Sequence, residues 1–246
     1  MWKNASVACS RVLNTVILTV IIFAGLAACS HGTTHVNQDA SSSEASGGEK
    51  IASSMSEYID ILLDSDDSAS ASMKISDSQR RILERARDSG EISRSDYEQS
   101  WADYKNCLVD RGWSEPPLLR FRNGIIDHTG YDATDLSEAQ VKRLDGDLME
   151  CTNLYTRDVA TVYGWQIGNV SLLQDGDAAV VDCLHREHLV DSAYDLAQYR
   201  DDFERQWQGE KTELDFSDAG VRGCLAANGR SSVGDNGSDA TWRPLG

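Results

Sequence analysis

The chain has 246 residues and a formal net charge of −17 at pH 7, from 40 acidic and 23 basic side chains. This balance argues against nucleic-acid binding, because lysine and arginine must neutralise the phosphates there, and against broad contact with anionic lipid headgroups. The acidic side chains favour solubility, and loose binding of cations or of a basic partner stays open.

The first residues have the order of a secretory signal peptide. Lys3 and Arg11 give a positively charged start, residues 16–26 are a nearly unbroken apolar run, and small residues then lead to a cysteine. The apolar run is shorter than the roughly 20 residues that a membrane-spanning helix needs. Its length argues against the alternative, an uncleaved transmembrane anchor.

The four residues Leu26-Ala27-Ala28-Cys29 resemble the lipobox of bacterial lipoproteins. The resemblance implies that residues 1–28 are removed and that the sulfur of Cys29 receives a diacylglyceryl group. Acyl chains such as palmitate would then hold the protein at the extracytoplasmic face of the cell membrane, and two chains give lasting attachment where one does not. Residues 29–52 are small and polar with almost nothing to bury, which predicts a flexible tether.

From residue 53 to residue 229 the pattern predicts one helical domain. Residues 53–63 place apolar side chains on one helical face. Ser76 with Gln79 is typical of a capping box, which opens a charged helix that ends before Gly90.

The clearest amphipathic segment follows. Ser95 and Glu98 predict a second capping box, and Gly112 predicts the end of the helix. Aromatic and apolar residues recur between them on one face, namely Tyr97, Trp101, Tyr104 and Leu108. Such spacing favours a core, and a sugar-binding face formed by the aromatic residues is the alternative.

The second part of the domain begins with a predicted hairpin. Asn123-Gly124 lies between short apolar runs, which is typical of a β-hairpin turn. Helix returns from about Ser137, and residues 158–168 either extend it or form a separate segment. Further helices are predicted over 177–189, 195–208 and 217–228. The tail from 230 to 246 is rich in Ser, Gly and Asp, which predicts disorder.

The cysteines predict disulfides. Cys9 lies in the signal and Cys29 takes the lipid, which leaves an even number in a chain sent to an oxidising compartment. The remaining residues are Cys107, Cys151, Cys183 and Cys224. The nearly equal separations favour the pairs Cys107–Cys151 and Cys183–Cys224. A zinc site is the alternative, and it lacks the usual Cys-x-x-Cys pair.

These cysteines belong to a weak internal sequence repeat. A Cys-Leu pair recurs at Cys107, Cys183 and Cys224, each in a predicted helix. The segments 93–170 and 171–229 are therefore candidate degenerate copies, each a helix pair joined by one bridge. A domain of this size can bury a sizeable single core.

One further resemblance concerns residues 90–228. The pattern Tyr97-x₃-Trp101-x₂-Tyr104-x₂-Cys107-Leu108-x₃-Gly112, followed by Cys151 and Tyr163-x₂-Gln166-x₂-Asn169, resembles uncharacterised secreted lipoproteins of actinobacteria. Val170 stands where those proteins have a proline. The resemblance implies an envelope location and a helical fold, and it brings no established activity.

The best candidate for metal chemistry is Asp182-Cys-Leu-His185-Arg-Glu-His188. On a helix, Asp182, His185 and His188 fall at i, i+3 and i+6, and their side chains are of types that bind zinc. The alternative is a histidine pair at the end of a helix, where a positive charge suits the helix dipole. The Asp145-x-Asp147-x-x-Glu150 run lacks the distal ligand of a calcium loop and favours a helix face.

The sequence therefore predicts a mainly α, disulfide-stapled domain with one short β-hairpin, carried on a lipid anchor. It contains no nucleophile elbow, phosphate loop or His-Glu-x-x-His run, so no cofactor or catalytic residue is predicted. We expect a binding or interaction module of the cell envelope, with another envelope protein or a cell-wall glycan as partner. The alternative is a metal-binding protein or metal-dependent enzyme centred on His185 and His188.

Overall fold

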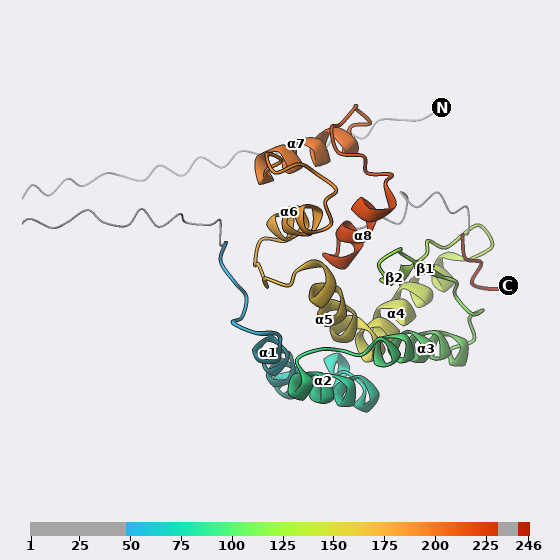
Figure 1. Ribbon diagram of the computed structural model, residues 1–246. Helices are drawn as coiled ribbons and strands as arrows, with labels where there is room; N and C mark the ends of the chain where they lie inside the picture. Colours follow the sequence, from blue (N-terminus) through green and yellow to red (C-terminus); the bar gives the residue numbers. More distant parts are fainter. Residues whose placement is uncertain (1–47, 231–240) are drawn as a thin grey trace, which may run out of the picture. The chain divides into compact units, whose positions relative to one another are not determined.

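The computed structural model describes residues 48–230 and 241–246, and there the chain is mainly helical with one β-hairpin, which confirms the predicted fold class (Figure 1). The helices are α1 (Met55–Ser68), α2 (Asp77–Ser89), α3 (Arg94–Asp110), α4 (Glu138–Tyr155), α5 (Arg157–Gly168), α6 (Gly176–Arg186), α7 (Leu196–Trp207) and α8 (Ala219–Ala227), with a short 3₁₀ helix at Ala71–Met73. The predicted signal peptide, Cys29 and most of the predicted tether lie outside the described residues. Within the described ranges, no helix has both the length and the apolar character to cross a membrane.

Serine and aspartate side chains cap the starts of most of these helices. Helix α4 begins after Ser137, as predicted, and Ser137 and Gln140 form a full capping box there. Ser76 caps α2, but the amide of Gln79 does not reach back to it. Two starts differ from the prediction by a short distance. Ser93 caps α3 in place of Ser95, and Asp218 caps α8 in place of Ser217, because each accepts a hydrogen bond from a backbone N–H of the first turn.

Residues 158–168 belong to a separate helix, α5, and do not extend α4. The helical backbone breaks at Thr156, whose φ is −122°. The break is bridged by Gln79 of α2, which is 1% exposed. Its Nε2 donates to the carbonyls of Asn153 and Leu154, and its Oε1 accepts from the N–H groups of Asp158 and Val159.

The hairpin forms where Asn123-Gly124 predicts it. β1 (Leu118–Arg120) pairs antiparallel with β2 (Ile126–His128), with Leu118 opposite His128. Gly124 has φ +87°, the left-handed conformation that the turn requires and that glycine adopts at low cost. Its N–H donates to the carbonyl of Phe121 at 2.9 Å.

Both predicted disulfides are confirmed. Cys107–Cys151 joins α3 to α4 across 44 residues, with the Cα atoms 5.9 Å apart. Cys183–Cys224 joins α6 to α8 across 41 residues, with the Cα atoms 5.7 Å apart. The first pair brackets the hairpin and the second brackets α7, so the two candidate halves differ in what lies between their bridged helices.

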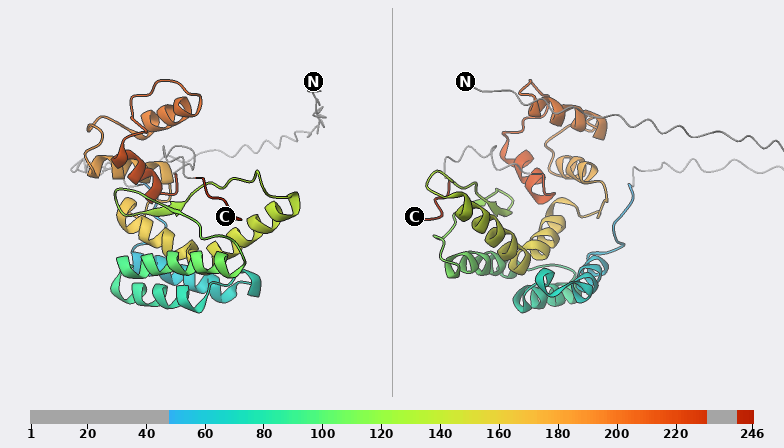
Figure 2. Two further views of the ribbon diagram at one scale, coloured as in Figure 1. Left: turned by 90° about the vertical axis from the view of Figure 1, so that its right-hand side faces the viewer. Right: turned by 180° about the vertical axis from the view of Figure 1, so that it is seen from behind.

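The expectation of a single core is wrong in detail, because the buried residues form two clusters. The larger cluster draws on α1 to α5, and the smaller one on α6, α7, α8 and the segments between them. Figure 2 shows α6, α7 and α8 as a group on one side of α5 and α1 to α4 on the other. Helices α5 and α8 approach closely at Gly164, where an added Cβ would lie 2.7 Å from the carbonyl oxygen of Ala227.

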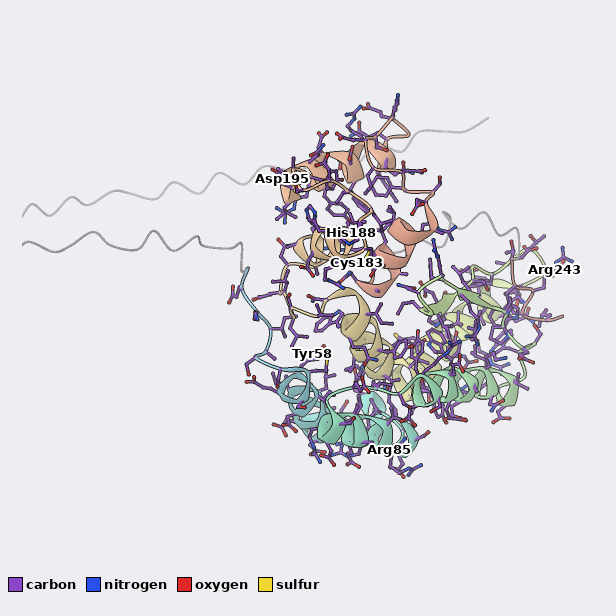
Figure 3. All side chains as sticks on the ribbon, viewed as in Figure 1. Tyr58, Arg85, Cys183, His188, Asp195 and Arg243 are labelled. Carbon is purple, nitrogen blue, oxygen red and sulfur yellow. A yellow bond between two sulfur atoms is a disulfide. The ribbon has the colours of Figure 1, made fainter. Side chains whose placement is uncertain are left out.

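The end of the chain also departs from expectation. The sequence predicts disorder from 230 to 246, yet residues 241–246 pack against the segments around the hairpin. Trp242 is 5% exposed, and its backbone forms an isolated parallel β-bridge with Tyr131. Its indole N–H donates to Ser114 Oγ at 2.8 Å. Long-range burial of one aromatic side chain thus orders a polar segment. In Figure 3, Arg243 lies on the side of the hairpin, apart from Cys183 of α6 and from His188, which follows α6.

Candidate functional site

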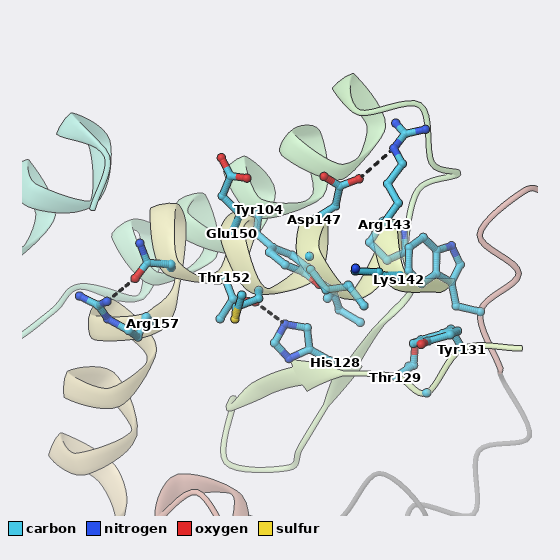
Figure 4. Close-up of a pocket in the computed structure, with 18 of the residues that line it drawn as sticks. Tyr104, His128, Thr129, Tyr131, Lys142, Arg143, Asp147, Glu150, Thr152 and Arg157 are labelled. Atoms are coloured by element: carbon cyan, nitrogen blue, oxygen red, sulfur yellow. Dashed lines mark hydrogen bonds and ion pairs between the residues drawn. The ribbon is translucent and has the colours of Figure 1, made fainter. Parts of the chain in front are cut away.

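A cleft of about 1130 Å³ opens between α4, the chain on both sides of the hairpin and the C-terminal segment (Figure 4). Most of the atoms that its walls expose are apolar. The apolar side chains include Met73, Leu118, Leu148, Met149 and Trp242. A concave, largely apolar site with a few polar groups is the usual form of a small-molecule site.

Helix α4 supplies one wall of the cleft, and its two faces differ. Leu144 and Cys151 are fully buried and turn inward. The opposite face, with Lys142, Gly146 and Met149 at helical spacing, turns to the cleft. From Lys142 to Asn153 this wall extends about 16 Å along the helix axis, at about 1.5 Å per residue. The cleft is therefore elongated along the helix.

Met149 is unusual among the residues of this wall. Its side chain is 74% exposed, and Met73, which also lines the cleft, is 54% exposed. Large apolar side chains that gather at an open cleft mark binding surfaces more often than isolated ones do. The flexible thioether of methionine also adapts to ligands of different shape.

The acidic residues in the cleft are neutralised by arginine. Arg111 donates to Asp147 at 2.7 Å and to Glu150 at 2.9 Å, and Trp113 Nε1 donates to Asp147 at 2.8 Å. Burial alone would raise the pKa of Asp147, but these hydrogen bonds hold the pKa below its ordinary value. The hydrogen bond from Arg111 likewise lowers the pKa of Glu150. Asp147 and Glu150 therefore bind arginine from the surface of a helix. This agrees with the prediction of a helix face and not with a calcium-binding loop.

The two arginines that line the cleft itself, Arg143 and Arg157, are also paired. Arg143 lies 3.5 Å from Asp147, and its guanidinium lies over the Trp113 ring at 5.0 Å. Arg157 donates to Asp158 at 2.8 Å and to the side chain of Asn153.

Lys142 differs from these arginines. Within the described residues it makes no hydrogen bond or ion pair. In Figure 4 its amine points toward the part of the cleft in which His128 of β2 and Thr152 of α4 lie. Lys142 is thus an unpaired cation in a cleft whose other charges are matched.

His128 of β2 forms the polar centre of the opposite wall. Its ring meets the edges of Trp101 and Tyr104 at centroid distances of 5.0 Å and 4.9 Å. Nδ1 lies 3.3 Å from Asp127 Oδ1, and Nε2 lies 3.4 Å from the Thr152 hydroxyl. The predicted core aromatics Trp101 and Tyr104 are buried and support this histidine.

The order of hydroxyl, imidazole and carboxylate resembles a nucleophile with its base, yet the surroundings favour binding over acyl transfer. Acyl transfer needs N–H donors aimed at a developing oxyanion. Thr152 lies inside α4, where the backbone N–H groups serve the helix itself. The nearby Asn153 amide donates to the carbonyls of Met73 and Lys74.

The residues of the metal hypothesis lie elsewhere, on and after α6. Asp182 pairs with Arg186 at 2.9 Å, and His185 Nε2 lies 2.8 Å from the carbonyl oxygen of Tyr194. His188 follows the helix with φ 56°. Among the described residues, no three His, Cys, Asp or Glu side chains come close enough to hold a metal ion.

Sequence reasoning missed most of the cleft. Lys142 and Met149 belong to no motif, and Trp242 lies in a tail predicted to be disordered. The one available signal was Gly146, since glycine inside a helix weakens it without an evident local reason. No known protein family, curated protein or solved structure matches this chain. The resemblance to secreted actinobacterial lipoproteins stays a prediction.

Proposed function

We propose that the chain is an exported lipoprotein of the cell envelope, anchored through Cys29, whose folded domain binds a ligand in the α4 cleft without catalysis. The anchor rests on the order of the first 29 residues. The binding role rests on one observation above the others, the exposed Met149 in the wall of an open apolar cleft.

Lipid attachment is tested by expression of the full chain in a bacterial host with labelled palmitate. We expect the label on the wild-type protein and none on Cys29→Ala. Cys9→Ala is the matched control, because Cys9 lies in the segment that cleavage would remove, and it should carry the label normally. Label retained by Cys29→Ala would overturn the proposed anchor.

Ligand binding is tested with a neutral photoreactive probe, a long-chain alcohol that carries a diazirine, added to the full-length protein in membranes. Cross-linked peptides identified by mass spectrometry should include Met149 and Met73. Met149→Asp should lose most of the label without loss of fold, because the side chain is mostly exposed. Val109→Asp is the control, since Val109 is 45% exposed and does not line the cleft. Label spread evenly over the surface would contradict a binding cleft.

A further inference from the structure

The charges in the α4 cleft do not add to zero. The acids Asp147 and Glu150 are held by Arg111, and Asp147 also by Arg143. Arg157 is held by Asp158, which is 5% exposed. Lys142 alone among these side chains has no partner in the part of the chain that the structure describes. The charged side chains that line the cleft are three cations and two acids, so the lining is net positive in a protein of net charge −17. Asp145, outside the lining, accepts a hydrogen bond from the Tyr131 hydroxyl at 2.6 Å and makes no ion pair with Lys142.

The two ends of the cleft differ in chemistry. Lys142 lies on the first turns of α4, and Tyr131 and Trp242 line the cleft with it. Further along the helix the walls carry Met149 and then Met73, whose carbonyl accepts from the Asn153 amide at 3.2 Å. A ligand that matches both ends has an anionic head and a long apolar body.

Gly146 lies between these ends. An added Cβ would meet no atom within 4 Å, so packing does not require glycine there. Glycine inside a helix costs about 0.5–1 kcal/mol relative to alanine. The missing side chain leaves the helix backbone open to the cleft between the cation and the methionines, where the body of an elongated ligand would pass.

From this arrangement we infer that the cleft binds a long-chain monocarboxylate, a fatty-acid-like amphiphile, with its carboxylate on Lys142 and its chain along Gly146, Met149 and Met73. One positive charge matches one carboxylate. The elongated wall suits a single chain. This inference rests on the proposed function, and it adds the chemical class of the ligand.

The test compares two photoreactive probes of the same chain length, a fatty acid and the neutral alcohol, on the full-length protein in membranes. We expect the acid to label the peptides of α4 and Met73 about tenfold more than the alcohol, because a charge-assisted hydrogen bond to a carboxylate is about twice as strong as a neutral one. Lys142→Met should reduce labelling by the acid to the level of the alcohol. Lys142→Arg, which keeps the charge, should restore most of it.

Lys211→Met is the matched control. Lys211 is exposed, lies outside the cleft and makes no hydrogen bond or ion pair within the described residues, so its removal should leave both probes unaffected. If acid and alcohol label the cleft equally, or if Lys142→Met keeps the preference for the acid, the inference is wrong and the binding cleft stands. If neither probe labels the cleft, the binding role fails as well.

Discussion

Gln79 shows how much a single side chain can decide in this fold. It belongs to α2 and is buried against the junction of α4 with α5, where its amide bonds to four backbone groups on the two sides of the helix break. One of them, the Leu154 carbonyl, also accepts from the N–H of Ser76. An unpaired buried backbone group costs about 1–3 kcal/mol. The angle between α4 and α5, and with it one end of the cleft, depends on this residue.

We predict that Gln79→Leu lowers the free energy of unfolding by more than about 2 kcal/mol, because the leucine replaces an amide that serves several buried groups. Gln79→Glu should also destabilise, since a carboxylate cannot donate to the carbonyls of Asn153 and Leu154. Urea denaturation measures both. Gln99→Leu is the control, because Gln99 is exposed on α3, and a change as large there would refute the argument.

We predict opposite effects on stability when either of two helical glycines, Gly146 or Gly164, is replaced by alanine. Gly146→Ala should raise stability by about 0.5–1 kcal/mol through the gain in helix propensity, since the space for a Cβ is open. Gly164→Ala should lower it, because the new Cβ would lie 2.7 Å from the carbonyl oxygen of Ala227. Thermal unfolding of the two variants measures both effects. A rise in stability for Gly164→Ala would show that α5 and α8 separate easily.

At the scale of elements, local patterns predict starts and turns well and predict long-range contacts poorly. Ser137 with Gln140 and Asn123-Gly124 each act through neighbours within a few residues, so the sequence contains the whole signal. The break at Thr156 depends on Gln79, which lies far away in the chain. No local pattern could therefore decide whether α4 continued into α5.

The same distinction explains the candidate site. The disulfide pairs followed from spacing, and one of them, Cys107–Cys151, fixes α3 against α4. The cleft itself forms where α4, the hairpin and the C-terminal segment meet, which only the tertiary structure defines. Trp242 is the clearest case, because its burial depends on residues more than a hundred positions earlier, such as Ser114.

The C-terminal segment provides a prediction at this scale. Trp242→Ala should release residues 241–246, because the buried indole and its bond to Ser114 hold them in place. The N–H of Asp132 donates to the carbonyl of Trp242, and the N–H of Ser114 to that of Pro244. Hydrogen exchange should quicken at these two amides. Exchange within α6 serves as the internal control and should not change, and unchanged rates at Asp132 would contradict the docking of the segment.

For the whole molecule, stability depends on pH through the carboxylates that are paired in the folded state. The pKa values of Asp147 and Glu150 lie below their ordinary values of 3.8 and 4.5, with Arg111 as the shared partner. A lowered folded-state pKa means stabilisation that is present above the ordinary pKa and is lost as pH falls through the lowered value.

We therefore predict that Arg111→Gln has a lower free energy of unfolding than the wild type at about pH 6. The difference between the two proteins should become smaller toward about pH 3, as the carboxylates become protonated. Denaturation curves of both proteins across this range measure the difference. Arg94→Gln is the control, since Arg94 and Glu98 form an exposed pair of little energetic weight. If the difference in free energy of unfolding between Arg111→Gln and the wild type stays constant with pH, Arg111 stabilises the fold through packing on α4 and not through its charge.

The order of the two bridges along the chain has a consequence for biogenesis. Cys107–Cys151 closes before Cys183 is reached, and Cys183–Cys224 then closes within the remaining length. A chain that crosses a membrane from its N-terminus presents its cysteines to an oxidant in this same order. If the chain is exported as proposed, joining each cysteine of the folded domain to the next that emerges would give the native pairs directly, and oxidation without isomerisation would suffice.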